Sequence, residues 1–319
     1  MAEGDPHNEE QTGVIWTHTV QGVLGICVLV LTGFMANHYA PPPTNDMQEQ
    51  VQQLTAQVRQ LKQEETMPTA VVSRYRDSIC YIFGIYRVGF PDQRPSLRAR
   101  ISGTGFLIAD SMLATNRHVA EPWYEDPESD VLLKKGAIPQ LEKLIAFFPG
   151  IEMPVNLESV ALSAQGDLAV LKVLDAPPAV RKLTSLPLAS DRPSPGEPVA
   201  VVGYPMGILG MVAKSPPPIY ERLALRKDDQ SAADELAALS LIRPSATYGH
   251  LGDVVGDKLI YDAPTAHGGS GGPVFNSHGE VIGINAAYID GFSGGTLGVS
   301  VQALRPLIVA AKRTSSKQP

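Results

Sequence analysis

Short apolar runs, in which hydrophobic and polar positions alternate, recur along the chain between residues 69 and 312. Glycine, proline, asparagine and aspartate separate the runs, and these residues favour turns. A period of two is typical of half-buried β-strands. We expect strands at Ile79–Val88, Leu97–Ile108, Leu168–Val173, Val199–Val202, Lys258–Tyr261, Val274–Asn276 and Val281–Ile284. The pattern therefore predicts an all-β domain, a sandwich or a barrel, over residues 69–312.

One stretch inside this domain has a helical pattern instead. Ser231 and Asp234 have the spacing of a capping box, and apolar residues follow at 236, 239 and 242. We therefore expect a helical insertion at about residues 219–243, between two strand-like regions. It covers the cleft, docks a partner, or is a surface excursion without consequence.

The amino-terminal part has a different texture. Residues 11–45 contain no charged side chain, and Val14–Met35 is mostly apolar. About 20 helical residues cross a bilayer, so we expect an amino-terminal tail at 1–12 and a single transmembrane helix at 13–36. A cleaved signal peptide is the alternative, but the start is acidic and lacks the usual cleavage pattern.

A spacer and a heptad pattern follow at residues 37–68. Pro41–Pro43 form a stiff spacer. Apolar residues then recur at alternating steps of four and three, as in the seam of a coiled coil: Met47, Val51, Leu54, Val58 and Leu61. We expect this 47–61 seam to make a homo-oligomer. The alternative is a solitary amphipathic stalk lying against its own domain.

Composition excludes several classes of function. The net charge is −7 and no long Lys/Arg block occurs, which argues against nucleic acid as a partner. The two cysteines, Cys27 and Cys80, cannot build a disulfide framework, and neither has metal-site spacing with histidine. We therefore expect no metal and no cofactor.

Three short motifs carry the candidate chemistry. The first surrounds His118 in Thr-Asn-Arg-His-Val, and the second surrounds Asp167 in Gly-Asp-Leu-Ala-Val-Leu-Lys. Either residue alone is more often structural. The third motif is the specific one, because Ser270 stands among four glycines in Gly-Gly-Ser-Gly-Gly-Pro-Val. Glycine-rich backbone can fold tightly and free its N–H groups.

Together the three motifs predict nucleophilic catalysis. A serine hydroxyl needs an adjacent base, which His118 can supply while Asp167 orients the imidazole. The backbone around Gly268, Gly269 and Ser270 can form an oxyanion hole. His267 is too close along the chain to be a convincing base.

These motifs resemble those of the chymotrypsin-like (trypsin-like) serine proteases, most of all the HtrA/Deg-type bacterial branch, over residues 75–310. The resemblance implies two antiparallel β-barrels, with His118 and Asp167 from the first barrel and Ser270 from the second. It also implies a serine endopeptidase acting on proteins or peptides. Gly269 replaces the aspartate that pairs with a new amino terminus in digestive members, so activity should not require an activating cut.

The same resemblance suggests specificity and domain content. By the family pattern the substrate pocket falls near Pro264, Thr265, Ala286, Ala287 and Tyr288. None of these is acidic, so we expect the pocket to accept small or medium apolar residues. We expect no PDZ module after the domain, and a tail at residues 313–319.

We expect a single-pass protein of the bacterial inner membrane. Its protease domain would lie in the periplasm and act in protein quality control or regulated proteolysis. The few basic residues, Arg59 and Lys62 first, weakly favour the opposite orientation. An inactive protease-fold binding module tethered to the membrane is the alternative function. An esterase is a third possibility, but the serine of an esterase elbow precedes a helix, whereas strand follows here.

Overall fold

The computed structural model describes residues 30, 32, 45–91, 93–288 and 295–315. The chain divides into two units, residues 1–61 and 62–319. The predicted transmembrane segment, residues 13–36, lies outside the described residues except at Val30 and Thr32. Among the helices that are described, none combines the length and the apolar character needed to cross a bilayer.

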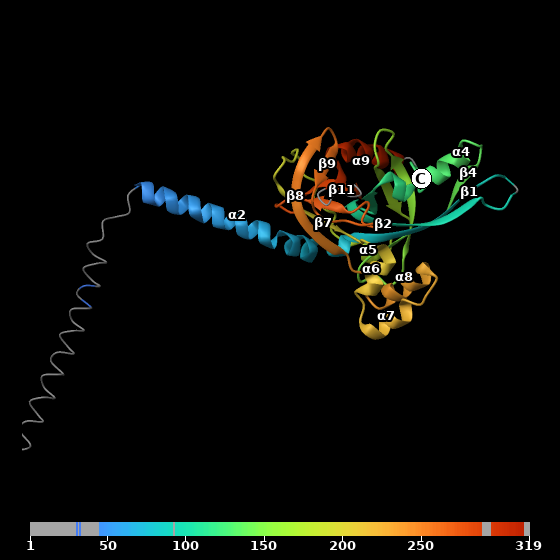
Figure 1. The fold of residues 1–319 in the computed structure, drawn as a ribbon, viewed down its shortest axis with the longest axis horizontal. Coiled ribbons are helices and arrows are strands. Elements are labelled where there is room, and N and C mark those ends of the chain that lie inside the picture. The colour runs from blue at the N-terminus through green and yellow to red at the C-terminus, as the bar shows by residue number, and fades with distance from the viewer. Residues whose placement is uncertain (1–29, 31, 33–44, 92, 289–294, 316–319) are drawn as a thin grey trace, which may run out of the picture. The chain divides into compact units, whose positions relative to one another are not determined.

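Two closed antiparallel barrels form the core of the second unit (Figure 1). The strand order of the first is β1-β2-β3-β6-β5-β4. Its strands are β1 (Ile79–Gly89), β2 (Leu97–Ala109), β3 (Met112–Thr115), β4 (Ile138–Phe147), β5 (Val155–Leu162) and β6 (Ala169–Val173). The order of the second is β10-β11-β12-β9-β8-β7. Its strands are β7 (Pro198–Gly203), β8 (Ser245–Val255), β9 (Lys258–Tyr261), β10 (Pro273–Phe275), β11 (Val281–Tyr288) and β12 (Thr296–Ser300). The all-β prediction is confirmed, in the form of two barrels.

Strand β1 explains how the barrels are joined, because both of its faces are buried. Cys80 and Ile82 point into the core of the first barrel. Tyr81 and Phe83 alternate with them and belong to a larger core that also contains Phe275 of the second barrel. Successive side chains of a strand point to opposite faces, so one strand packs into two cores. The site lies where the barrels meet.

Short helices connect or cover the barrels. They are α3 (Arg117–Ala120), α4 (Pro127–Leu133), α5 (Pro178–Arg181), α6 (Gly207–Ala213), α7 (Pro217–Leu223) and α8 (Asp229–Ala238). The last helix, α9 (Val301–Ser315), follows β12 directly and packs on strands of both barrels. Leu304 and Ala311 of α9 are fully buried.

The helical insertion is larger than predicted and begins earlier. Its helices α6, α7 and α8 lie between residues 207 and 238, so they begin before the predicted 219 and end before 243, and they lie together beside the barrels (Figure 1). The expected cap is also wrong, since Asp228 rather than Ser231 caps α8, its side chain accepting from the Gln230 N–H at 3.2 Å. Pro217 in the first turn of α7 explains why α6 and α7 are separate helices, because proline favours a helix start.

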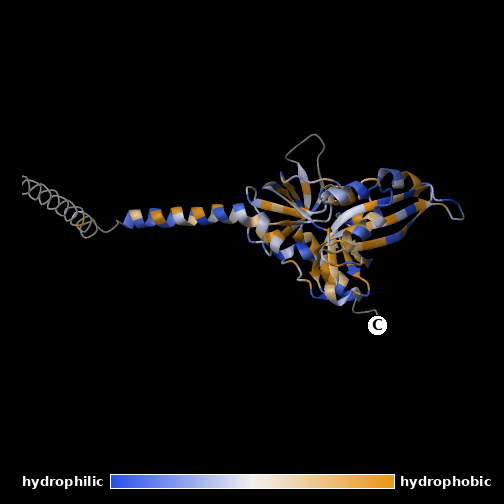
Figure 2. Ribbon diagram, turned by 90° about the horizontal axis from the view of Figure 1, so that it is seen from below, coloured by the Kyte–Doolittle hydropathy of each residue, from blue (hydrophilic) through white to orange (hydrophobic). Residues whose placement is uncertain are grey.

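Helix α2 (Asn45–Tyr75) contains the predicted heptad seam and continues beyond it. The seam residues are exposed, from Val58 at 51% to Leu61 at 64%. Figure 2 shows apolar positions recurring among hydrophilic ones along this helix. Within the second unit, Met67, Val71 and Tyr75 are buried, and the Tyr75 ring stacks on Phe275 with centroids 5.7 Å apart.

Candidate active site

His118 and Asp167 meet through two hydrogen bonds within the first barrel. Strand β3 ends at Thr115 and the short helix α3 starts two residues later, which presents His118 at the rim. Its Nδ1 lies 2.7 Å from Asp167 Oδ2, and its backbone N–H donates to Asp167 Oδ1 at 2.9 Å. The two side chains are 30% and 20% exposed, so the pair remains accessible from the cleft. The carboxylate thus fixes both the ring and the backbone of the histidine.

Neighbouring residues hold this pair in place. Asn116 is fully buried, and its side-chain amide donates to the backbone carbonyl of Asp167 at 2.8 Å. The Arg117 guanidinium donates to the Ser163 carbonyl at 2.7 Å and pairs with Glu121 at 2.8 Å. These contacts tie α3 to the loop that precedes β6.

Ser270 lies on a glycine loop of the second barrel, just before β10. Gly268 and Gly271 have φ values of +90° and +87°, a region that favours glycine. A Cβ atom on Gly268 would lie 2.6 Å from the Tyr204 carbonyl oxygen, and one on Gly271 would lie 2.0 Å from the Thr104 carbonyl oxygen. The glycines are therefore required both by conformation and by space.

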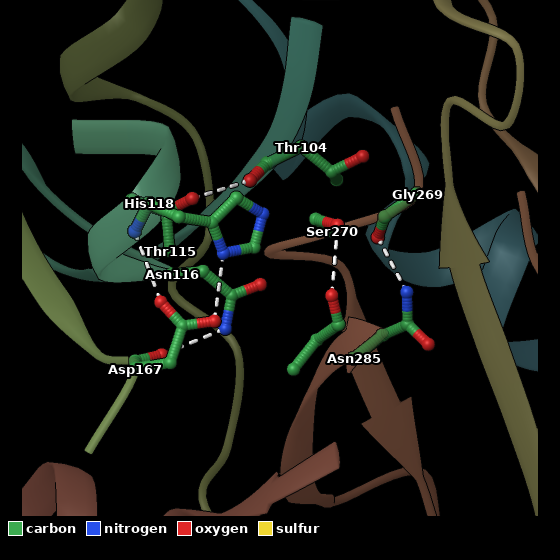
Figure 3. Close-up of polar contacts among 9 residues, drawn as sticks. Thr104, Thr115, Asn116, His118, Asp167, Gly269, Ser270 and Asn285 are labelled. Atoms are coloured by element: carbon green, nitrogen blue, oxygen red, sulfur yellow. Dashed lines mark hydrogen bonds and ion pairs between the residues drawn. The ribbon is translucent and has the colours of Figure 1, made fainter. Parts of the chain in front are cut away.

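Three successive carbonyl groups of this loop are held by hydrogen bonds. The His267 carbonyl accepts from the Met206 N–H at 2.6 Å. The Gly268 carbonyl accepts from the Thr104 hydroxyl at 2.7 Å. The Gly269 carbonyl accepts from the Asn285 amide at 2.9 Å, as Figure 3 shows. Among the described residues, the N–H groups of Gly268 and Ser270 have no acceptor. Two donors in this loop are thus available to a ligand.

A cleft of about 560 Å³ brings the predicted triad together. In Figure 3 the His118 ring lies between the Asp167 carboxylate and the loop of Ser270. The Ser270 hydroxyl donates to the Ala286 carbonyl at 2.9 Å. The residues that line the cleft are Tyr86, Ile101, His118, Pro122, Tyr124, Glu125, Asp126, Asp167, Thr265, Ala266, His267, Ser270, Asn285 and Ala286.

The predicted substrate-pocket residues divide into two groups. Thr265 and Ala286 line the cleft beside Ser270. Pro264 is exposed and lies outside the lining. Ala287 and Tyr288 belong to β11, where their backbones pair with Leu297 and Thr296 of β12.

Sequence reasoning missed four residues that support the site. Thr104, Asn116 and Asn285 are buried polar side chains, and Met206 contributes its backbone N–H. Thr104 stands between two glycines, and Asn285 is the single amide side chain within the apolar run of β11. A lone polar residue in a buried strand is a usable signal, because burial of a polar group requires a partner.

The family follows from a comparison with known proteins. The model of the "Trypsin-like peptidase domain" family matches residues 103–284, which is more than half of the 319 residues. The chain belongs to the trypsin-like peptidase family. The match includes His118, Asp167 and Ser270, and both barrels contribute to it.

Individual relatives are similar to parts of this family member. A "Probable periplasmic serine endoprotease DegP-like" of Rhizobium meliloti (strain 1021) is 32% identical over 206 residues, covering 64% of this chain and 31% of that protein. A protein of the same name from Chlamydia pneumoniae is 28% identical, covering 66% of this chain and 34% of that protein. The crystal structure of the serine endoprotease from Yersinia pestis superposes with a TM-score of 0.49 at 18% identity, covering 77% and 66% of the two chains. The chain thus spans about a third of the length of these curated relatives.

Proposed function

We propose that this chain is a serine endopeptidase, which hydrolyses peptide bonds through an acyl-enzyme intermediate. The observation that carries the proposal is the meeting of the His118–Asp167 pair and Ser270 at one cleft. Membership of the trypsin-like peptidase family supports it. The curated relatives are named as serine endoproteases, which agrees with this chemistry.

The triad would act in the order that its contacts suggest. Ser270 Oγ attacks the substrate carbonyl carbon and its proton passes to His118 Nε2. Asp167, bonded to Nδ1, stabilises the imidazolium that forms. The imidazolium then protonates the leaving amine, and water, activated by the same base, releases the acid product.

The nucleophile must first leave its present partner. Its hydroxyl donates to the Ala286 carbonyl rather than to His118. Rotation about the Cα–Cβ bond moves a serine hydroxyl between staggered positions. Losing one neutral hydrogen bond costs about 1 kcal/mol, which the new bond to His118 offsets. Substrate binding in the cleft would favour the reactive position.

The free N–H groups of Gly268 and Ser270 would receive the developing oxyanion. A planar trans peptide directs its C=O and N–H to opposite sides. Because Met206 holds the His267 carbonyl on one side, the Gly268 N–H points to the other. Such preorganised donors stabilise charge that develops in the transition state.

The substrate pocket would favour small or medium apolar side chains. Thr265 and Ala286 contribute to its lining without a charge. A cationic substrate side chain would have no carboxylate at these positions, and an unpaired buried charge is costly.

Labelling with a fluorophosphonate tests the proposed function directly. In this reaction Ser270 Oγ forms a bond to phosphorus, fluoride leaves and the hydroxyl proton passes to His118. The full chain should take up the label and cleave a fluorescent casein. Ser270→Ala should do neither, whereas Ser277→Ala, in the turn after β10, should behave as wild type. Label on the Ser270→Ala protein would remove the nucleophile assignment. A wild type that binds casein without cleaving it or taking up label would favour the inactive binding module.

We also propose that the exposed seam of α2 pairs with a second copy of this chain. Met47, Val51, Leu54, Val58 and Leu61 are more than half exposed and keep the heptad spacing. Sedimentation of the full chain in detergent should give an oligomer that Leu54→Asp dissociates and Gln53→Asp does not. A wild-type monomer would contradict this.

The location of the protease domain is proposed from two observations. Residues 13–36 have the length and composition of a membrane span, and the relatives are named periplasmic. We therefore propose a membrane tether with the domain in the periplasm, acting in protein quality control or regulated proteolysis. External protease should degrade the domain in spheroplasts but not in intact cells. Protection in spheroplasts would reverse the orientation.

A further inference from the structure

Asn285 is a buried polar residue of β11 that faces the nucleophile loop. It is 1% exposed, and both ends of its side chain are bonded. Its Nδ2 donates to the Gly269 carbonyl at 2.9 Å and to Thr265 Oγ1 at 3.1 Å. Its Oδ1 accepts from the Tyr261 hydroxyl at 2.7 Å. The side chain therefore joins β9, the cleft lining and the residue before the nucleophile.

The chemistry of its partners fixes which end of the amide faces the loop. A backbone carbonyl can only accept a hydrogen bond, so the NH₂ group must face Gly269. Oδ1 then faces Tyr261, whose hydroxyl must donate. Burial raises the pKa of the Tyr261 hydroxyl well above its ordinary value, which keeps that proton in place. The Gly269 carbonyl thus sets the orientation of the amide, and the Tyr261 hydroxyl anchors its Oδ1 end.

The contact to Gly269 determines the direction of the next N–H group. The Gly269 carbonyl and the Ser270 N–H belong to one planar trans peptide, so they point to opposite sides. Holding the carbonyl toward β11 therefore directs the Ser270 N–H away from β11. We propose that Asn285 is a positioning residue for the oxyanion hole, with Tyr261 as its anchor. This inference rests on the proposed peptidase function.

The backbone of Asn285 strengthens the same connection. Its N–H donates to the Gly272 carbonyl and its carbonyl accepts from the Gly271 N–H, both at 2.8 Å. These backbone bonds survive any substitution at 285, so the loop should keep its general course. Removing the side chain should loosen only the Gly269–Ser270 peptide, whose carbonyl keeps its bond from the Gly272 N–H at 3.1 Å. Loss of a whole oxyanion donor typically lowers the rate by about 10² to 10³-fold. Loss of the Asn285 side chain should lower the labelling rate less, by roughly 10 to 100-fold.

The test compares rates of fluorophosphonate labelling in the full chain. Asn285→Leu removes the donor at similar volume and should lower the rate by roughly 10 to 100-fold. Tyr261→Phe leaves the Asn285 Nδ2 donor in place but removes the hydrogen bond that holds Oδ1. It should lower the labelling rate by about fivefold, the equivalent of one neutral hydrogen bond. Asn276→Leu is the matched control. Its amide also bonds to backbone, in the turn after β10, so it should lose stability without losing rate.

A pH profile separates positioning from general damage. If Asn285 acts only on the oxyanion hole, the rate falls at every pH and the midpoint set by the catalytic base stays where it is. A melting temperature far above the assay temperature verifies that each variant is folded. If Asn285→Leu does not fold, the labelling rate of Tyr261→Phe alone tests the proposal.

The outcomes of this test are distinct. Equal rates for wild type and the folded variants would overturn the role of Asn285 while leaving the peptidase function intact. A shifted midpoint would also overturn it, since the base would then be displaced. A wild type that takes up no label would overturn the proposed function and this inference together.

Discussion

The two barrels contribute to the cleft in different ways. The first barrel supplies side chains that bond to each other, His118 Nδ1 to Asp167 Oδ2 at 2.7 Å. The second supplies the Ser270 hydroxyl and, around it, backbone: two glycines with positive φ and three carbonyls bonded from outside the loop. The first half therefore depends on residue type, and the second, apart from Ser270 itself, depends on conformation. Substitutions in the two halves should consequently fail for different reasons.

The largest effect should come from the side-chain half. Asp167→Asn keeps the shape of the side chain but removes the charge that stabilises the imidazolium, and it favours the wrong tautomer. We expect a fall of about 10⁴-fold in turnover of casein, as for the same change in a serine-protease triad. Thermal unfolding should change little by comparison. A variant with more than a tenth of wild-type turnover would show that Asp167 is not the orienting carboxylate.

The conformational half should be tested at Gly268. In Gly268→Ala the new methyl would meet the Tyr204 carbonyl and the Gly207 N atom, at 2.6 and 2.8 Å. The peptide must move, and we expect a loss of the order of 10²–10³-fold in labelling rate.

Gly256→Ala is the control for this change. Gly256 also has a positive φ, +62°, but apart from its chain neighbours no described residue has an atom within 4 Å of the place that a Cβ atom would take. The substitution should cost about 1 to 2 kcal/mol of stability from backbone strain alone and leave the labelling rate unchanged. Similar rates for both variants would mean that the loop conformation is unimportant.

A smaller effect is expected at Thr104, which links the two halves. Its hydroxyl donates to the Gly268 carbonyl and accepts from the Tyr204 N–H at 3.1 Å, and its N–H donates to the Ser270 carbonyl at 2.8 Å. Thr104→Val removes only the hydroxyl, so we expect about a tenfold lower labelling rate and a loss of roughly 1 to 3 kcal/mol in unfolding free energy. Thr104→Ser should restore most of the rate. Failure of serine to rescue would assign the effect to packing.

The smallest effect concerns Cys80, inside the first barrel. Burial raises the pKa of its thiol, and its Sγ donates to the Gly105 carbonyl at 3.4 Å. Because the thiolate is the reactive form, iodoacetamide should leave Cys80 unmodified in the native protein and modify it in guanidinium chloride. Peptide mapping by mass spectrometry reads this residue separately. Rapid native modification would show that the first barrel opens and is less rigid than its contacts indicate.

Much of this architecture could be predicted from the sequence. Period-two alternation locates β2 and β9, because one face of each packs into a core. Strand β1 is located by its apolar run instead, since both of its faces are buried. Strand partners could not be predicted in the same way. Strand β4 pairs with β1 across 49 to 66 residues, from Gly89 with Ile138 to Tyr81 with Phe147. Periodicity carries no information about which strand lies beside another.

Some residues of the site could be predicted from the sequence and others could not. His118, Asp167 and Ser270 stand in distinctive local motifs, so residue type and neighbours are enough to propose them. Thr104 and Asn285 act through contacts outside their own strands: Gly268 lies 164 positions from Thr104, and the partners of the Asn285 side chain lie 16 to 24 positions from it. The prolines at 216–218 mark the start of α7, because proline favours the first turn of a helix. This effect is local, so the start of α7 could be predicted from the sequence.

The structure of the fluorophosphonate adduct tests the central claim most directly. We expect phosphorus on Ser270 Oγ and a phosphoryl oxygen at about 2.7 to 3.1 Å from the N atoms of Gly268 and Ser270. The Ser270 oxygen should have left the Ala286 carbonyl, with His118 beside it. An adduct on another residue, or a phosphoryl oxygen directed away from both N–H groups, would contradict this mechanism.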